Sequence, residues 1–291
     1  MIKMKGKKNY CGLPDEYCNE SNSKIVVIPV PYDKTSTWIK GADNGPSAIL
    51  EASANMELYD IETDSEIYKS GIYTASPVVE SASSEKMMNS VKNKVNNYIK
   101  KGKFAVVLGG EHSISIGSIK AHVENYNNLC VLQLDAHSDL RDSYNGSKYS
   151  HACVMARARE ICPIVQVGIR SIDSSEFKVM NKERVFFAKD IQKNKEWVKG
   201  VVRLLSDKVY LTIDLDVLDP SIMPSTGTPE PGGLLWYDIL ALLKEVIDKK
   251  ELVGFDIVEL CPNPANKAPD FLASKLLYKI LSYKFGGCKN E

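Results

Sequence analysis

Short runs of apolar and β-branched residues recur along this chain, and segments with helical patterning separate them. Eight runs are predicted to form strands, at residues 24–30, 71–75, 104–108, 129–134, 163–169, 184–188, 209–214 and 252–258. The helical segments are residues 46–56, 85–101, 113–125, 150–160, 194–205, 236–249 and 270–283. Strands that alternate with helices build βαβ units and a mostly parallel sheet. The pattern leaves an open sheet and a closed barrel as alternatives, and in both the functional side chains gather at the carboxyl ends of the strands.

Polar residues follow four of these apolar runs. The motifs are GGEH at 109–112, DAHSD at 135–139, DLDVLD at 214–219 and DIVE at 256–259. In extended chain, alternate side chains point to the same side, so Asp135, His137 and Asp139 are expected to converge. Such a group at the end of a buried run is costly without a counter-charge, and a divalent metal ion supplies one.

Histidines concentrate in the same motifs. The chain has four histidines, and His112, His137 and His151 lie in or just after these strand ends. The candidate metal ligands are His112, Asp135, His137, Asp139, Asp214 and Asp216. Two imidazoles and four carboxylates suit two divalent ions about 3.5–4 Å apart that share bridging carboxylates, and such a pair ionises a water near neutral pH. Oxygen-rich ligation with some imidazole favours Mn²⁺.

Other polar residues near these strand ends allow more than one interpretation. Glu259 is suited to accept a bidentate pair from a guanidinium, although it also fits a salt-bridged loop acid. His151 is suited to pass protons to a leaving amine, although it also fits a surface histidine at a helix start. Residues 224–233 form a loop rich in proline and glycine, which either walls a site or is a plain rigid connection. His122 is interpreted as structural or solvent-facing.

Composition and charge exclude several classes of function. Lys+Arg and Asp+Glu both number 37, so the net charge is zero, which argues against nucleic acid and anionic membranes as partners. The seven cysteines show no C-x-x-C spacing and indicate reduced thiols in a cytoplasmic protein. No signal peptide or run near the ~20 apolar residues of a membrane span is found. Residues 1–23 are predicted to be an irregular polar arm before a single domain over residues 24–291.

The motifs together resemble the ureohydrolase family of arginases and agmatinases. The matching segments are GGEHS at 109–113, LDAHSD at 134–139, His151, residues 214–234, FDIVEL at 255–260 and residues 30–49. The similarity extends over nearly the whole chain from residue 24. It implies a three-layer α/β/α fold with an eight-stranded, mostly parallel sheet, and therefore an open sheet rather than a barrel.

The resemblance also implies a site with two Mn²⁺ ions per chain. In that site His112 and Asp139 bind one ion, His137 and Asp216 bind the other, and Asp135 and Asp214 bridge the two. A bridging hydroxide, oriented by Asp139, attacks the guanidinium carbon of the substrate. The resemblance further implies that Glu259 holds the guanidinium, that His151 is the proton shuttle, and that the products are urea and an amine.

The substrate that the resemblance favours is agmatine, which gives putrescine for polyamine synthesis. Arg141 stands where arginases place an asparagine, and the loop 140–150 is one residue shorter than in arginases. Two features favour an amino-acid substrate instead. Asp173 matches the arginase aspartate for the substrate's α-amino group, and Arg141 could meet a carboxylate if it pointed inward, although this side chain is expected to be exposed. Arginine, guanidinobutyrate and formiminoglutamate are the alternative substrates, and a non-catalytic metal-binding protein is disfavoured because every ligand is present. The resemblance implies a homo-oligomer, a trimer or a hexamer.

Overall fold

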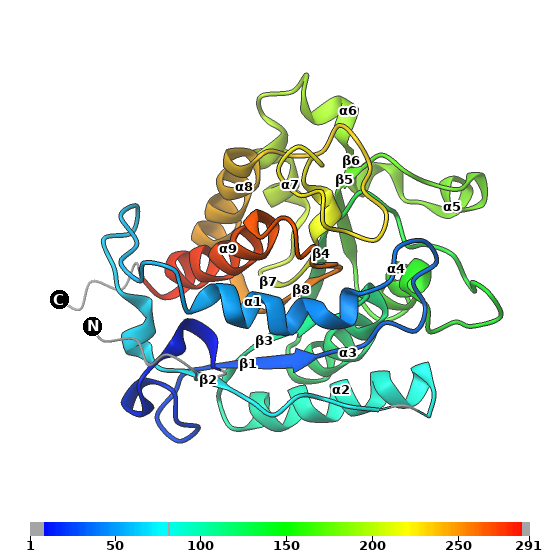
Figure 1. Cartoon of the computed structure of the whole chain (residues 1–291). Coiled ribbons are helices and arrows are strands. Elements are labelled where there is room, and N and C mark those ends of the chain that lie inside the picture. The colour runs from blue at the N-terminus through cyan, green and yellow to red at the C-terminus, as the bar shows by residue number, and fades with distance from the viewer. Residues whose placement is uncertain (1–8, 81, 287–291) are drawn as a thin grey trace.

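The computed structural model describes residues 9–80 and 82–286. Its centre is one sheet of eight strands in the order β2-β1-β3-β8-β7-β4-β5-β6, and every neighbouring pair is parallel (Figure 1). The strands are β1 (Ile25–Val30), β2 (Ile72–Thr74), β3 (Phe104–Gly109), β4 (Leu129–Leu134), β5 (Ile164–Ile169), β6 (Val185–Phe187), β7 (Lys208–Asp214) and β8 (Glu251–Val258). The prediction of eight strands in an open, parallel sheet is confirmed.

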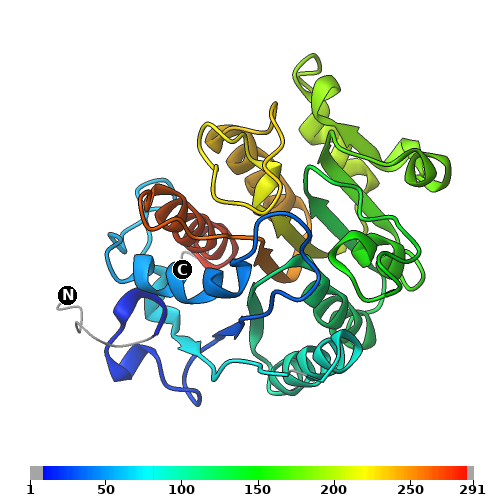
Figure 2. The same cartoon turned by 45° about the vertical axis from the view of Figure 1, so that its right-hand side comes forward.

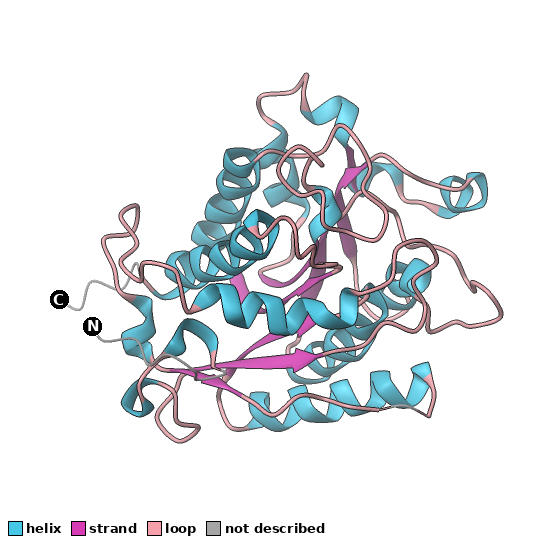
Figure 3. Ribbon diagram, in the orientation of Figure 1, coloured by secondary structure: helices cyan, strands magenta, loops and turns pink. Residues whose placement is uncertain are grey.

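Helices cover both faces of this sheet, which gives the three layers (Figure 3). They are α1 (Gly45–Ser53), α2 (Ser84–Lys100), α3 (Ser115–Asn125), α4 (Val154–Ala158), α5 (Ser174–Val179), α6 (Ala188–Ile191), α7 (Trp197–Leu204), α8 (Trp236–Lys249) and α9 (Ala268–Phe285). The short helices α5 and α6 have no counterpart in the sequence prediction. One layer contains α1, α7, α8 and α9, and the other contains α2, α3 and α4.

The core consists of two apolar clusters, one on each face of the sheet. Along β1, Ile25 and Val27 belong to the cluster that faces α1 and α9, whereas Val26 and Ile28 belong to the cluster that faces α2 and α3. All four side chains are fully buried. Alternate residues of a strand face opposite sides, so a strand covered on both faces is apolar throughout. The sheet is therefore a rigid base, and the loops at its carboxyl edge carry the polar residues.

The described N-terminal residues pack against the core. Tyr10 and Leu13 are fully buried, and the Tyr10 hydroxyl donates to the Ser274 carbonyl at 2.8 Å. The boundary between an arm (1–23) and a domain (24–291) stays a prediction, and residues 1–8 lie outside the described residues. Five described cysteines, Cys18, Cys130, Cys153, Cys162 and Cys261, are free thiols, and Cys288 lies outside the description. Among residues 9–80 and 82–286, no helix combines the length and apolarity that a membrane crossing needs.

Candidate metal centre

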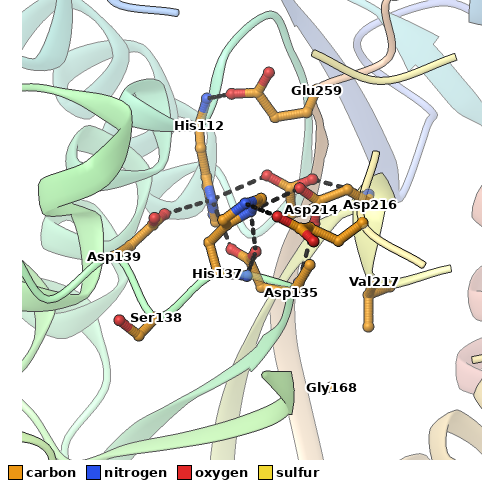
Figure 4. Close-up of polar contacts among 12 residues, drawn as sticks. His112, Asp135, His137, Ser138, Asp139, Gly168, Asp214, Asp216, Val217 and Glu259 are labelled. Carbon is orange, nitrogen blue, oxygen red and sulfur yellow. Dashed lines mark hydrogen bonds and ion pairs between the residues drawn. The ribbon is translucent and has the colours of Figure 1, made fainter. Parts of the chain in front are cut away.

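The candidate ligands lie at the carboxyl ends of four neighbouring central strands, β3, β8, β7 and β4. His112 follows β3, the DAHSD motif follows β4, Asp214 ends β7, and Glu259 follows β8. The close-up in Figure 4 shows these side chains turned towards one another from their separate strands. The structure therefore brings together all six residues that the sequence predicted as ligands, although they are spread over about a hundred positions of the chain.

One half of the cluster surrounds the His112 imidazole. Its Nδ1 atom lies 3.0 Å from Asp139 Oδ2, 3.2 Å from Asp135 Oδ2 and 3.4 Å from Asp214 Oδ2. His112 is 1% exposed, and among the described residues its Nδ1 makes no hydrogen bond. A buried nitrogen that faces three carboxylate oxygens without a hydrogen bond has the arrangement of a ligand to a cation.

The other half surrounds His137 and shares Asp135 with the first. His137 Nδ1 lies 2.8 Å from Asp216 Oδ2 and 3.6 Å from Asp135 Oδ1. Two triplets of ligand atoms result, His112–Asp135–Asp139 and Asp135–His137–Asp216, and the atoms of each lie within 4.8 Å of one another. Two overlapping triplets with a common carboxylate fit a pair of ions better than a single ion.

The cluster is electrostatically unfavourable by itself. Burial, and then the charge of Asp135, raises the pKa of the Asp139 carboxyl to about 7. Burial, followed by the charges of Asp216 and Asp135, raises the pKa of Asp214 well above its usual range. Burial opposes the charge on His137, yet Asp216 and Asp135 outweigh it and raise its pKa to about 12. Carboxylates so close together need a positive charge among them, and divalent cations supply it at the lowest cost in desolvation.

Hydrogen bonds beneath the cluster fix the orientation of His112. Its Nε2 lies 2.8 Å from Thr212 Oγ1, and the Thr212 hydroxyl donates to Asp256 Oδ1 at 2.6 Å. Tyr210 donates to the other oxygen of Asp256 at 2.6 Å. Because the Thr212 proton goes to Asp256, Thr212 Oγ1 must accept the Nε2–H of His112. Nδ1 is then the ring nitrogen that faces the carboxylates. Burial opposes a charge on His112, yet Asp135, Asp139 and Asp214 outweigh it and raise its pKa well above the usual range, so a metal ion at Nδ1 would replace a proton.

This support continues across the sheet as a row of buried polar residues. Gln166, Gln133, Thr212 and Asp256 are in register on β5, β4, β7 and β8. Gln166 Nε2 donates to Gln133 Oε1 at 2.6 Å, and Gln133 Nε2 donates to Asp135 Oδ2 at 2.7 Å. No role was predicted for these four residues, although Asp256 belongs to the DIVE motif and the other three are visible as single polar residues inside apolar strands.

Glu259 lies beside the two triplets and belongs to neither. Its Oε1 accepts the backbone N–H of His112 at 2.7 Å, so one carboxylate oxygen is held in place. A Cβ at Gly227 would lie 3.7 Å from its other oxygen, Oε2, so the glycine keeps that side of the carboxylate open. The backbone of Glu259 has a φ of 66°, a left-handed conformation that is costly for a residue with a side chain.

His151 lines the same cavity from the loop that precedes α4. Its Nδ1 lies 3.1 Å from Thr35 Oγ1, and the edge of its ring packs against Tyr144 with the ring centres 5.7 Å apart. Burial, followed by the charges of His112 and His137, lowers the pKa of His151 to about 4. The imidazole is therefore neutral at physiological pH and able to take up a proton. His122, by contrast, is fully buried in α3 and lies outside the cavity, as a structural role predicts.

The cavity above the cluster has a volume of about 340 Å³. Gly227 and Thr228 line it, as expected if the loop 224–233 walls a site. Arg141 also lines it and is half-buried, which corrects the prediction that this side chain is exposed. Its guanidinium lies 3.6 Å from both Asp173 and Glu176, because this acidic pair draws it inward. Figure 2 shows the loops gathered above the carboxyl edge of the sheet.

Comparisons with known proteins agree with this fold and site. A sequence model of the Arginase family matches residues 23–282. The N(1)-aminopropylagmatine ureohydrolase of Synechocystis sp. is 36% identical over 274 residues, and that of Thermus thermophilus is 38% identical over 266 residues; each alignment covers 90% of both proteins. The crystal structure of agmatine ureohydrolase of Thermoplasma volcanium superposes with a TM-score of 0.87, at 34% identity, over 97% of this chain and 95% of the other.

The family match, the full-length relatives and the common fold lead to one conclusion. This chain belongs to the arginase family and is a ureohydrolase close to the agmatinase-like enzymes.

Proposed function

We propose that the chain is a manganese-dependent hydrolase that releases urea from the guanidinium group of agmatine. The observation that carries the proposal is the pair of overlapping ligand triplets that share Asp135 at the base of the cavity. His112 and Asp139 would hold one Mn²⁺, and His137 and Asp216 would hold the other. Asp135 and Asp214 would be shared by the two ions, and Asp214 Oδ2 lies 3.4 Å from His112 Nδ1. The buried, unbonded Nδ1 of His112 and the four carboxylates are what such ions require. When bound, the ions lower the pKa of water, so that a nucleophile is available at neutral pH.

The remaining site residues bind the substrate and move the proton. Glu259 would pair with the substrate guanidinium through Oε2, because Oε1 is already held by the His112 backbone. Asp139 would accept a hydrogen bond from the attacking water and orient it. Water adds to the guanidinium carbon, and the bond from that carbon to the tail nitrogen breaks. His151 would take a proton from the attacking water and pass it to the leaving nitrogen, so that the products are urea and putrescine, which leaves as the protonated amine.

Charge at the mouth of the cavity favours a cationic substrate tail. Asp173 and Glu176 place two carboxylates there, and Arg141 offsets only one of the two charges. Arg141 is also engaged with this pair and stacks on Tyr144 at 4.9 Å, so it is poorly placed to receive a substrate carboxylate. Arginine, guanidinobutyrate and formiminoglutamate each carry a carboxylate, and they are therefore weaker candidates than agmatine.

A second candidate substrate is N(1)-aminopropylagmatine, which carries the same guanidinium and a longer cationic tail. The relatives with 36% and 38% identity are named for that substrate. The acidic cavity mouth suits its tail as well as that of agmatine, and both reactions would use the same residues. The homo-oligomer, the cytoplasmic location and the polyamine pathway stay predictions.

A urea-release assay separates these candidates. The protein would be loaded with Mn²⁺ and given agmatine, N(1)-aminopropylagmatine, arginine and guanidinobutyrate in parallel. We expect kcat/KM to be at least about 100-fold higher for the two amine substrates than for the two carboxylates, a difference of about 2.7 kcal/mol. Preference for a carboxylate substrate would overturn the substrate proposal, and binding of fewer than two Mn²⁺ per chain would overturn the binuclear site.

A further inference from the structure

The loop after β1 holds a hydroxyl against the back of His151. Asp33 closes this loop on itself, because its Oδ2 accepts the backbone N–H groups of Gly41 at 2.7 Å and Ala42 at 3.2 Å. Ser36, Thr37 and Trp38 at the tip of the loop line the cavity. Thr35 precedes these three residues and is not among the described residues that line the cavity.

The Thr35 hydroxyl makes two contacts with His151. Its Oγ1 accepts the backbone N–H of His151 at 3.0 Å and lies 3.1 Å from His151 Nδ1. Thr35 and His151 are 116 positions apart in the sequence, so this contact exists only in the folded chain. The other neighbours of the imidazole hold it less closely: Ser150 Oγ lies 3.4 Å from Nδ1, and Tyr144 makes only a ring-edge contact.

These two contacts fix which ring nitrogen of His151 faces the cavity. A threonine hydroxyl has one proton to donate and two lone pairs that accept, so Oγ1 can hold the backbone N–H and Nδ1 of His151 at once. Nδ1 is therefore turned towards Thr35, and Nε2 is the ring nitrogen left for the cavity that His151 lines.

We propose that Thr35 is a positioning residue that holds the His151 ring in the orientation that turns Nε2 towards the cavity. The proposal rests on the role proposed above for His151 in proton transfer. Thr35 touches neither the substrate nor the candidate metal ligands in this arrangement. Its loss should therefore slow the step that needs a correctly placed Nε2, and leave substrate binding and metal binding nearly unchanged.

Steady-state kinetics of Mn²⁺-loaded variants test this inference, with whichever amine substrate gives the higher kcat/KM. We expect Thr35→Val to lower kcat by about 10- to 100-fold, as misplacement of a catalytic group does, with KM within about threefold and the Mn²⁺ content unchanged. Thr35→Ser keeps the hydroxyl and should return kcat to within about threefold of wild type. Thr63→Val is the matched control, because Thr63 bonds Asp60 and Ser65 and is not a cavity residue.

The double variant Thr35→Val/His151→Ala separates a positioning role from a general structural one. If Thr35 acts through His151, the double variant should be no slower than His151→Ala alone, within about twofold. If kcat of the double variant fell below that of His151→Ala by the same factor as Thr35→Val lowers it alone, the inference would be overturned. A lower Mn²⁺ content in Thr35→Val, or a raised KM with unchanged kcat, would also overturn it. If Thr35→Val does not fold by circular dichroism, Thr35→Ala carries the same expectation.

Failure of the inference is distinguishable from failure of the proposed function. If His151→Ala is slow and Thr35→Val has the kcat of wild type, only the role of Thr35 is rejected. A His151→Ala variant with wild-type kcat would reject the proton-transfer role of His151, and with it the inference.

Discussion

Replacement of Thr212 by valine tests the hydrogen bonds beneath the candidate metal centre. Valine has nearly the shape of threonine and suits a strand, so Thr212→Val removes a hydroxyl with little change in packing. Two groups lose their partner: the Nε2–H of His112 and Oδ1 of Asp256. Their residues are 1% and 0% exposed, so water cannot replace the hydroxyl without opening the core.

The magnitude follows from these two unsatisfied groups. A buried polar group left without a partner costs about 1–3 kcal/mol, and more for a charged group. We therefore expect the free energy of unfolding of the metal-free protein to fall by about 2–5 kcal/mol. The His112 ring also loses the contact that fixes its tautomer, and loss of such outer support lowers metal affinity about 10- to 100-fold.

Urea unfolding in the presence of a chelator measures the first effect, and calorimetric titration with Mn²⁺ measures the second. Thr212→Ser is the matched control, because it keeps the hydroxyl and loses only a methyl group. We expect it to bind Mn²⁺ within about threefold of wild type. The reasoning is refuted if Thr212→Val unfolds at the same urea concentration as wild type and binds Mn²⁺ with the same affinity.

Three further predictions concern other parts of the chain. Glu259→Gln should retain both Mn²⁺ ions and lose at least about 100-fold in kcat/KM for urea release, because the guanidinium loses its charged partner; unchanged kcat/KM would remove Glu259 from substrate binding. Gly168 has a φ of +94°, and a Cβ at this position would lie 2.7 Å from Val217 Cγ2 and 3.0 Å from the Asp135 carbonyl oxygen. Gly168→Ala should therefore destabilise the fold by about 1–3 kcal/mol in thermal unfolding. A variant with the melting temperature of wild type would contradict this backbone conformation. Burial lowers the pKa of His122 to about 4, below its value in the unfolded chain, so between pH 6.5 and 4 the unfolded state binds a proton that the folded state does not. The free energy of unfolding should therefore fall by about 3 kcal/mol as pH falls from 6.5 to 4. Urea unfolding of His122→Leu should lack this decrease, and equal decreases in wild type and variant would show that His122 does not cause it.

Much of the fold was predictable from local pattern. Strand 129–134 and helix 236–249 have the bounds that the sequence predicts, because each is a strongly patterned segment with clear ends. The helices α5 and α6 were missed, since runs of six and four residues are too short to show a helical period. Predicting the ligand set was possible because its residues end apolar runs, and parallel strands place those ends at one edge of the sheet.

The supporting residues were harder to predict, because their roles depend on strand order. Gln133 and Thr212 face each other only because β4 pairs with β7, and Thr212 faces Asp256 only because β8 lies on the other side of β7. No local pattern contains that order. The same is true of Thr35 and of the inward position of Arg141, because each is fixed by a partner from a distant loop. The residues at strand ends could therefore be predicted from the sequence, whereas the contacts between strands could not.

The position of β8 has a consequence for how the protein is made. Among the described strands it comes last in the sequence, yet it lies in the middle of the sheet, between β3 and β7. Until residues 251–258 arrive, the sheet has two halves, β2-β1-β3 and β7-β4-β5-β6, each with an unpaired inner edge. Pairings so distant in sequence form slowly, and open strand edges attract other chains. A nascent chain therefore cannot assemble both halves of the ion site, and it is most prone to aggregation just before its last strand leaves the ribosome.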